Sequence, residues 1–156
     1  MAMRGFFDLQ TPEHLLRKLE RDYAQLQQVP DDVDAAYNFF ATAENMPEWV
    51  KEGGKRGKTF KHQIQQQHLI LTLCNQLATG AKHITSDKQK PAVAETRHEG
   101  VLERGICEPG IYEAWLSIRL SPEQAVQRGE DTIGALTLAG EVLAFWQQHL
   151  TGDPPR

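Results

Sequence analysis

A run of lysine, glycine and threonine between residues 51 and 59 has the composition of a phosphate-binding loop. Such a loop needs a glycine, four further residues and then Gly-Lys-Ser/Thr, so that backbone amides can surround the phosphates. Gly57, Lys58 and Thr59 supply the end of this motif, but Glu52 stands where the first glycine belongs. The run also follows a helical pattern and not a buried strand. We therefore predict a flexible helix–helix connection here and no nucleotide-binding loop.

The same run concentrates positive charge in an acidic chain. Four basic side chains are candidates for contact with phosphate or nucleic acid: Lys55, Arg56, Lys58 and Lys61. A basic loop at the start of a helix is suited to the phosphates of a nucleic-acid backbone. A solvated loop accounts for the same charges without a ligand, and the sequence leaves both interpretations open.

The histidines show no metal-binding pattern. His62 and His68 are six residues apart, so they point to different faces of a helix. Neither a His-Glu-x-x-His nor a Cys-x-x-Cys motif occurs. Because these spacings are what bring zinc ligands together, we predict no metal site and no cofactor.

The segment from Leu77 to His83 places a histidine just after a predicted helix. This arrangement resembles the HEPN-type helical domains, in which an arginine lies shortly before the histidine. The resemblance implies a metal-independent ribonuclease that acts as a dimer, with His83 as the proton-transfer group. The positions where the arginine belongs hold Gln76, Leu77 and Ala78. Lys82 or Arg56 would then supply the cation that stabilises charge on the phosphate.

His83 also has a structural interpretation, as a helix-terminal residue that interacts with the last carbonyl groups. The chain as a whole resembles a group of small, functionally uncharacterised bacterial proteins. That likeness is carried by the stretches Gly5 to Glu13, Tyr37 to Ala43 and Ala78 to His83, together with Trp49 and Phe145-Trp146. It implies a helical fold and a bacterial or phage origin, and it brings no activity with it.

The composition is that of one ordinary globular domain, with 156 residues, 40% of them hydrophobic and 24% charged. A net charge of -4 argues against a dedicated nucleic-acid binder. Cys74 lies in an apolar run and is predicted to be a small buried residue. No apolar run reaches the roughly 18 residues of a membrane span, and no signal-peptide pattern is present. We expect a cytoplasmic protein without membrane contact.

Capping residues and apolar spacing predict four main helices. The first should start at Thr11 and end near Gln28. The second should start at Asp31-Asp32, be kinked or shortened by Pro47, and end before Gly53-Gly54. The other two are expected from about residue 59 to residue 78, ending at Gly80, and from about residue 132 onward.

A strand is predicted between the last two helices, because residues 111–120 alternate between apolar and polar. Its partner is expected between residues 93 and 102. Residues 121–124 look like a helix start, but they lead only to a short polar run that ends at Gly129. Trp115 lies on the strand face opposite Leu116 and Ile118, so it is a candidate interface residue.

These elements predict a mainly α fold, a four-helix bundle with a small β-hairpin inserted between helices 3 and 4. Residues 1–150 should form a single domain, followed by a disordered tail at residues 151–156. The function that the sequence favours is a non-catalytic interaction or regulatory protein with a protein partner or a homodimer. The alternative is a divergent HEPN-like metal-independent ribonuclease of a toxin or defence system, acting on RNA.

Overall fold

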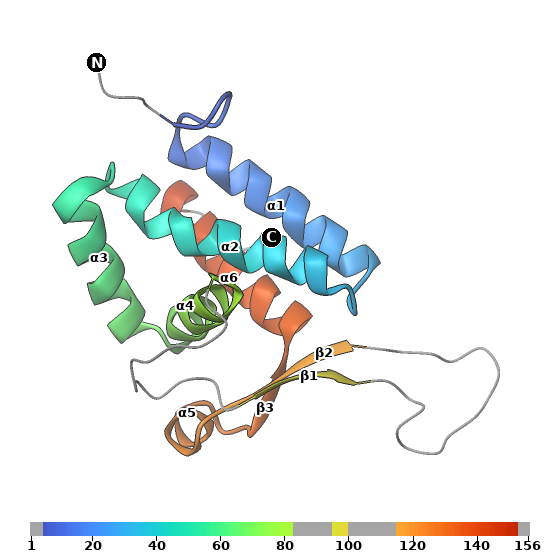
Figure 1. The fold of residues 1–156 in the computed structure, drawn as a ribbon. Coiled ribbons are helices and arrows are strands. Elements are labelled where there is room, and N and C mark those ends of the chain that lie inside the picture. Colours follow the sequence, from blue (N-terminus) through green and yellow to red (C-terminus); the bar gives the residue numbers. More distant parts are fainter. Residues whose placement is uncertain (1–4, 83–94, 100–114, 153–156) are drawn as a thin grey trace.

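The computed structural model describes residues 5–82, 95–99 and 115–152, and this part of the chain is mainly helical with a small antiparallel sheet (Figure 1). Its elements in chain order are α1 (Pro12–Gln28), α2 (Val33–Val50), α3 (Gly54–Gln67), α4 (Leu69–Lys82), β1 (Glu95–Glu99), β2 (Trp115–Arg119), α5 (Pro122–Arg128), β3 (Thr132–Gly134) and α6 (Ala135–Thr151). No helix in the described ranges is both long and apolar enough to cross a membrane.

The first two helices begin where the capping residues predict. The Thr11 hydroxyl accepts a hydrogen bond from the backbone N–H of His14 at 3.2 Å, and α1 ends at Gln28. The Asp32 carboxylate caps α2 in the same way. Pro47 does not end the second helix, which continues to Val50. The two helices lie side by side along most of their length (Figure 1).

The expected third helix over residues 59–78 is in fact two helices, because the chain turns at His68. The backbone of His68 is extended, with φ -131° and ψ 111°. The His68 N–H still bonds to the carbonyl of Ile64, and the Thr72 hydroxyl donates to the carbonyl of Gln65 at 2.6 Å. The backbone groups freed by the turn therefore keep partners, which makes a sharp break tolerable inside the fold.

The break lets the two halves of this segment run in different directions (Figure 1). The first half carries the polar run of residues 65–67, whereas α4 buries Leu71, Leu73 and Cys74 in the core. Gly80, which was expected to end the helix, lies inside α4. The apolar pattern located the buried face but did not reveal the change of direction between the two halves.

The sheet has three strands in the order β1-β2-β3, all antiparallel. Both strands of the predicted hairpin are confirmed within the described ranges, but β3 was not predicted. The stretch from residue 132, expected to begin the last helix, pairs with β2 and places Ile133 opposite Ile118, both of them buried. The last helix therefore starts only at Ala135. The predicted hairpin is thus part of a small sheet rather than an insertion of two strands alone.

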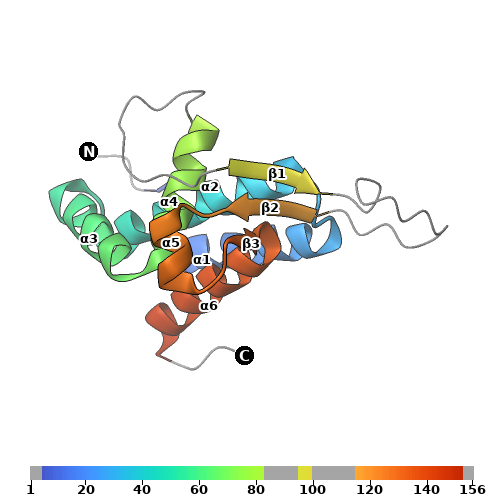
Figure 2. The same ribbon diagram turned by 90° about the horizontal axis from the view of Figure 1, so that it is seen from below.

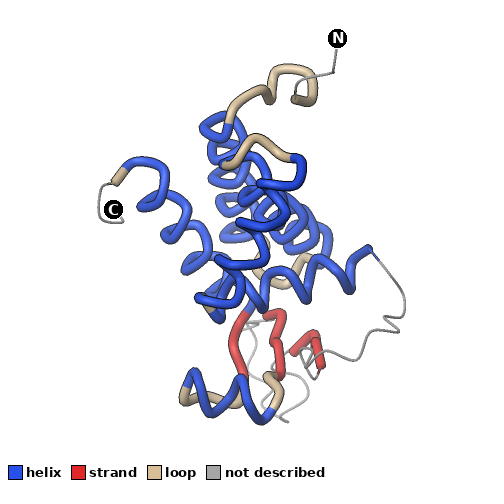
Figure 3. The backbone as a smooth tube through the Cα atoms, turned by 90° about the vertical axis from the view of Figure 1, so that its left-hand side faces the viewer, coloured by secondary structure: helices blue, strands red, loops and turns tan. Residues whose placement is uncertain are grey.

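The short polar run after Ser121 forms a helix, α5, which was not among the four helices predicted. Ser121 and Gln124 form a reciprocal capping box, and Gly129 closes the helix with a left-handed backbone. The buried side chain of Gln124 donates to Gln76 of α4 at 2.9 Å, which ties α5 to the helical part. Figure 3 shows the sheet and α5 together at one end of the helices.

The core is formed around α6, which packs against α1, α2 and α4 and follows directly from β3 (Figure 2). Its buried residues are Ala135, Leu138, Ala139, Val142, Leu143 and Trp146. Leu19, Phe39 and Leu73 come from three other helices, are fully buried and belong to the same core cluster. The mainly α class predicted from the sequence is thus confirmed, whereas the described part of the chain has six helices instead of a four-helix bundle with a hairpin between helices 3 and 4.

Candidate functional site

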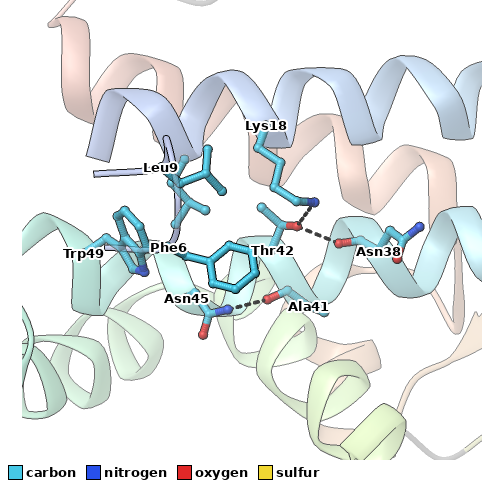
Figure 4. A pocket seen from close by; sticks show the side chains of 9 residues that line it. Phe6, Leu9, Lys18, Asn38, Ala41, Thr42, Asn45 and Trp49 are labelled. Carbon is cyan, nitrogen blue, oxygen red and sulfur yellow. Dashed lines mark hydrogen bonds between the residues drawn. The ribbon is translucent and has the colours of Figure 1, made fainter. Parts of the chain in front are cut away.

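A pocket of about 300 Å³ opens between α1 and α2, beneath the turn that precedes α1 (Figure 4). Its lining comes from all three segments: Phe6, Leu9, Leu15, Lys18, Asn38, Ala41, Thr42, Asn45 and Trp49. This volume is at the lower end of the range that small ligands or single large side chains occupy. The pocket brings side chains of these two helices and of the preceding turn to one hollow.

One end of the pocket is polar and tightly bonded. The Lys18 ammonium donates to Asp22 Oδ2 at 2.6 Å and to Thr42 Oγ1 at 2.8 Å. The Thr42 hydroxyl lies 2.6 Å from the same carboxylate oxygen and 2.8 Å from the carbonyl of Asn38. Figure 4 shows Lys18, Thr42 and Asn38 together at this end, with Trp49 at the other.

These bonds hold Thr42 in place and do not prepare it for attack on a substrate. Thr42 is buried in the third turn of α2 and bonds to the carbonyl four residues earlier. Its oxygen already accepts from Lys18, and its one hydrogen is taken by Asp22 or Asn38. The arrangement therefore fixes Lys18 at the pocket and is suited to binding.

The N-terminal turn (Phe6–Leu9) covers part of the pocket. Phe6 and Leu9 exchange both backbone hydrogen bonds, at 2.7 and 2.9 Å, and the Gln10 side chain donates to the carbonyl of Phe7. Gly5 has φ +71°, and a methyl group there would collide with the carbonyl oxygen of Leu9. The turn thus needs glycine at that position, and it holds the Phe6 ring over α2 (Figure 4).

A row of side chains on α2 leads into this pocket. Val33, Tyr37, Ala41 and Asn45 are spaced four residues apart and so lie on one side of the helix. Val33 and Tyr37 are 61% and 51% exposed, while Ala41 and Asn45 line the pocket. The α2 row and the N-terminal turn therefore form one continuous outer surface.

The candidate phosphate contacts lie on α3, and the structure separates them into two groups. Lys55, Arg56 and Lys58 are exposed in the first turns of this helix, whose N-cap Gly53 offers no side-chain bond. Lys61 instead pairs with Glu44 at 2.5 Å and Glu48 at 3.4 Å on α2. The interpretation of residues 54–59 as a flexible loop was wrong, since they are helical; contact with phosphate stays a prediction.

Glu44 is the centre of a polar network between α2, α3 and α4. Besides Lys61 it accepts from Asn75 at 2.6 Å and from Gln65 at 3.4 Å. Burial lowers the pKa of Lys61, but the hydrogen bond and charge of Glu44, with Glu48 in support, outweigh it and hold that pKa above 10.5. This lysine is therefore part of the packing between helices.

We expect Lys61→Met to lower the free energy of unfolding at neutral pH by roughly 2 kcal/mol, the value of a hydrogen-bonded charged contact. Because the folded protein raises the pKa of Lys61, this contribution is full below pH 10.5 and is lost as the pH rises through the folded value. Urea unfolding of both proteins between pH 8 and pH 11 measures the difference. A difference that stays constant across that range would contradict the assigned pairing.

Cys74 is buried in α4, as predicted, and its thiol faces the carbonyl of Phe40 at 3.9 Å. Burial raises the pKa of this thiol well above its ordinary value, and the Glu44 carboxylate adds to the effect. We expect iodoacetamide to leave Cys74 unmodified in the native protein at pH 8 and to alkylate it in urea. Peptide mass spectrometry measures the modification of Cys74 separately from that of Cys107. Equal modification of Cys74 in the native and the urea-unfolded protein would show that α2 and α4 separate readily in the native state.

The ribonuclease candidates lie at the end of α4 and just after it. Lys82 is the last residue of α4, and its side chain is not among those described. His83 lies outside the described residues, so the catalytic role of this pair stays a prediction. Trp115 starts β2 and is half-buried, and its role at an interface also stays a prediction. Within the described ranges no three potential ligands come together as a metal site.

Comparison with protein families, curated sequences and solved structures finds no match to this chain. The function is therefore inferred from the arrangement of its own side chains. The pocket was not predicted from sequence, although two signals point to it. Lys18 and Asp22 have the spacing of a helical ion pair, and Thr42 is a polar residue within an otherwise apolar stripe.

Proposed function

We propose that this protein is a non-catalytic interaction protein of a regulatory kind, which binds a protein partner through the N-terminal turn and the α2 row. The observation that carries this proposal is the placement of exposed apolar side chains. Five large apolar residues are strongly exposed among the described residues, and four of them belong to this surface: Phe6, Phe7, Val33 and Tyr37. Apolar residues scattered singly need no explanation, but a continuous group marks an interaction surface.

The size of the surface also fits a partner segment. The α2 row extends about 18 Å along its helix, at 1.5 Å per residue. An extended segment of about five or six residues spans that distance, as does a helix of about three turns. Phe7, at 83% exposed, and Phe6, at 60%, stand at one end of the row as aromatic anchors.

The polar groups nearby support binding over catalysis. Lys18, Asp22 and Thr42 are bonded to one another, and Lys61 is bonded to Glu44 and Glu48. A catalytic acid or base has to be free to exchange a proton with a substrate, whereas these groups hold helices together. The second candidate, a HEPN-like ribonuclease, rests on Lys82 and His83 and is addressed directly by the test below.

Photocrosslinking in living cells tests the interaction. A benzophenone amino acid replaces Tyr37 on the α2 row or, as a matched control, Val126 on α5, which is 85% exposed and away from the surface. We expect a discrete protein adduct from position 37 that position 126 does not give; a second copy of the chain as the adduct would identify a homodimer. Adducts of the same pattern from both positions would contradict the proposal.

A nuclease assay tests the non-catalytic part. Purified protein is incubated with labelled RNA and a chelator, beside the His83→Ala variant. We expect intact RNA with both proteins. Metal-independent cleavage that disappears in the variant would overturn the proposal and establish the ribonuclease alternative.

A further inference from the structure

The exposed face of α3 is basic and polar along its whole length. We propose that this face binds duplex DNA, with the helix in the major groove and with Arg56 and Lys58 at the phosphates on its two sides. The inference goes beyond the proposed function, because it concerns a second surface and a second kind of partner.

Positive charge is concentrated on and just before this helix. Residues 51–67 contain five lysines and arginines and one acid, Glu52, in a chain that has 17 lysines and arginines and 21 acids in all. The helix itself contains no acidic residue. Because a DNA duplex carries one negative charge per about 1.7 Å of its axis, it is attracted to α3 and repelled by the acidic remainder of the chain. The net charge of the protein therefore favours contact through α3 over contact through its other faces.

Three of these cations are available to a ligand. Lys55, Arg56 and Lys58 are exposed, and their side chains form no ion pair or hydrogen bond with any residue of the described ranges. On α5, by contrast, Arg128 is already paired with Glu141 at 2.7 Å. A paired cation has to leave its carboxylate before it can bind a phosphate, whereas the three cations of α3 do not.

The exposed face of α3 carries no apolar side chain. Its exposed side chains are Lys55, Arg56, Lys58, Thr59, His62, Gln63, Gln66 and Gln67. The apolar residues Phe60 and Ile64 are turned toward the fold, where Ile64 is buried and Phe60 half-buried. A helix that lies on a membrane needs apolar side chains on the face that enters the lipid. This face is therefore suited to a charged partner in water and not to a membrane surface.

The order of the side chains around the helix fits a groove with a phosphate wall on each side. With 3.6 residues per turn, Lys55, Thr59 and Gln66 form a row on the side away from the core. Arg56 and Lys58 lie on either side of this row, about 160° apart around the helix axis. A helix with its side chains is about 10–12 Å across, and the major groove of DNA is about 12 Å wide. The two flanking cations can thus reach both walls while the row faces the base edges.

The position of α3 in the fold leaves this face accessible. Among the described elements, α3 packs mainly against α2 and α4, and Figure 1 shows it at the edge of the helices with both of these on one side. Lys61 lies on that inner side, where it is paired with Glu44 and Glu48. We therefore assign Lys61 to holding α3 in place and leave it out of the DNA contact.

Fluorescence anisotropy of a short labelled DNA duplex tests the inference with the full-length protein. At 50 mM salt we expect a Kd on the order of 10 µM, which is typical of contacts with the backbone alone. Three phosphate contacts release about three counterions, so raising the salt to 200 mM should weaken binding about 40-fold.

Two double variants with the same change in net charge locate the binding. Arg56→Gln with Lys58→Gln removes the flanking cations, and we expect binding at least tenfold weaker at 50 mM salt and a salt dependence that corresponds to about one contact. Arg17→Gln with Arg21→Gln changes two exposed positions of α1 and should bind DNA within about twofold of the unmodified protein. Circular dichroism of each variant shows that its helices are intact.

Four results would overturn the inference. Absence of binding at 50 mM salt would remove the DNA contact, and equal binding by the two double variants would separate it from α3. Duplex RNA of the same sequence bound as tightly as DNA would exclude the groove, because the major groove of RNA is too narrow for a helix. Labelled polyglutamate bound as tightly as DNA would make the face a site for acidic proteins. The crosslink from position 37 tests the proposed function separately in every case.

Discussion

Replacing Trp146 with alanine is expected to lower the free energy of unfolding by about 3–5 kcal/mol, the largest effect of any single substitution considered. Trp146 is fully buried on α6, in edge-to-face contact with Phe145 at 5.0 Å and near His149 at 5.5 Å. Truncation removes a large apolar surface and leaves a cavity that α1, α2 and α4 cannot close without moving together.

Denaturation in urea, followed by far-ultraviolet circular dichroism, measures this loss. Trp146→Phe is the matched control, and we expect it to cost less than half as much. Phenylalanine keeps most of the ring contacts, and it removes an indole N–H that has no hydrogen-bond partner among the described residues. A loss below about 1 kcal/mol for the alanine variant would contradict a central position of α6.

Gly57→Val is expected to destabilise the protein by about 1–3 kcal/mol, because there is no room for a side chain at this point of α3. A Cβ atom at Gly57 would lie 3.3 Å from both the Cα and the carbonyl oxygen of Glu48. These are backbone atoms of α2, so relief requires the two helices to separate. The glycine that gave the sequence its likeness to a phosphate loop is thus required by helix packing.

Gly80 provides the matched comparison, since it also lies inside a helix and a Cβ atom there would meet no side chain or neighbouring element within 4 Å among the described residues. Alanine at Gly80 is expected to stabilise by up to about 1 kcal/mol through helix propensity. Alanine at Gly57 should show no such gain, because the close contact offsets the propensity. Thermal unfolding of the three variants tests this order, and an equal gain at both glycines would show that α2 and α3 are not in close contact.

Local signals in the sequence were sufficient for elements whose ends are defined by nearby residues. Thr11 and Asp32 cap their helices through bonds to the next few amides, and Ser121 to Gly129 forms a helix from its own capping groups. The alternation that predicted β2 is likewise local, since it reflects the two faces of one strand. The mainly α class with a small sheet followed from these elements.

Features that depend on distant contacts were missed. Residues 132–134 carry a weak strand signal and become β3 because β2 offers them a partner and a buried place for Ile133. The chain turns at His68 because α3 and α4 pack against different sets of elements. The spacing of apolar residues does not predict such a turn. The pocket depends on a hydrogen bond between Lys18 of α1 and Thr42 of α2. The spacing of residues along the chain does not predict such a contact between two helices.

The position of α6 has a consequence for how the protein is made. This helix packs against α1, which is synthesised well before it, since more than a hundred residues separate Gln28 from Ala135. A ribosome builds the chain from the N-terminus, so the apolar faces of α1, α2 and α4 exist before the helix that covers them. Until Trp146 has emerged, those faces have no cover from α6, and we expect a chain truncated before α6 to expose them to aggregation and proteolysis.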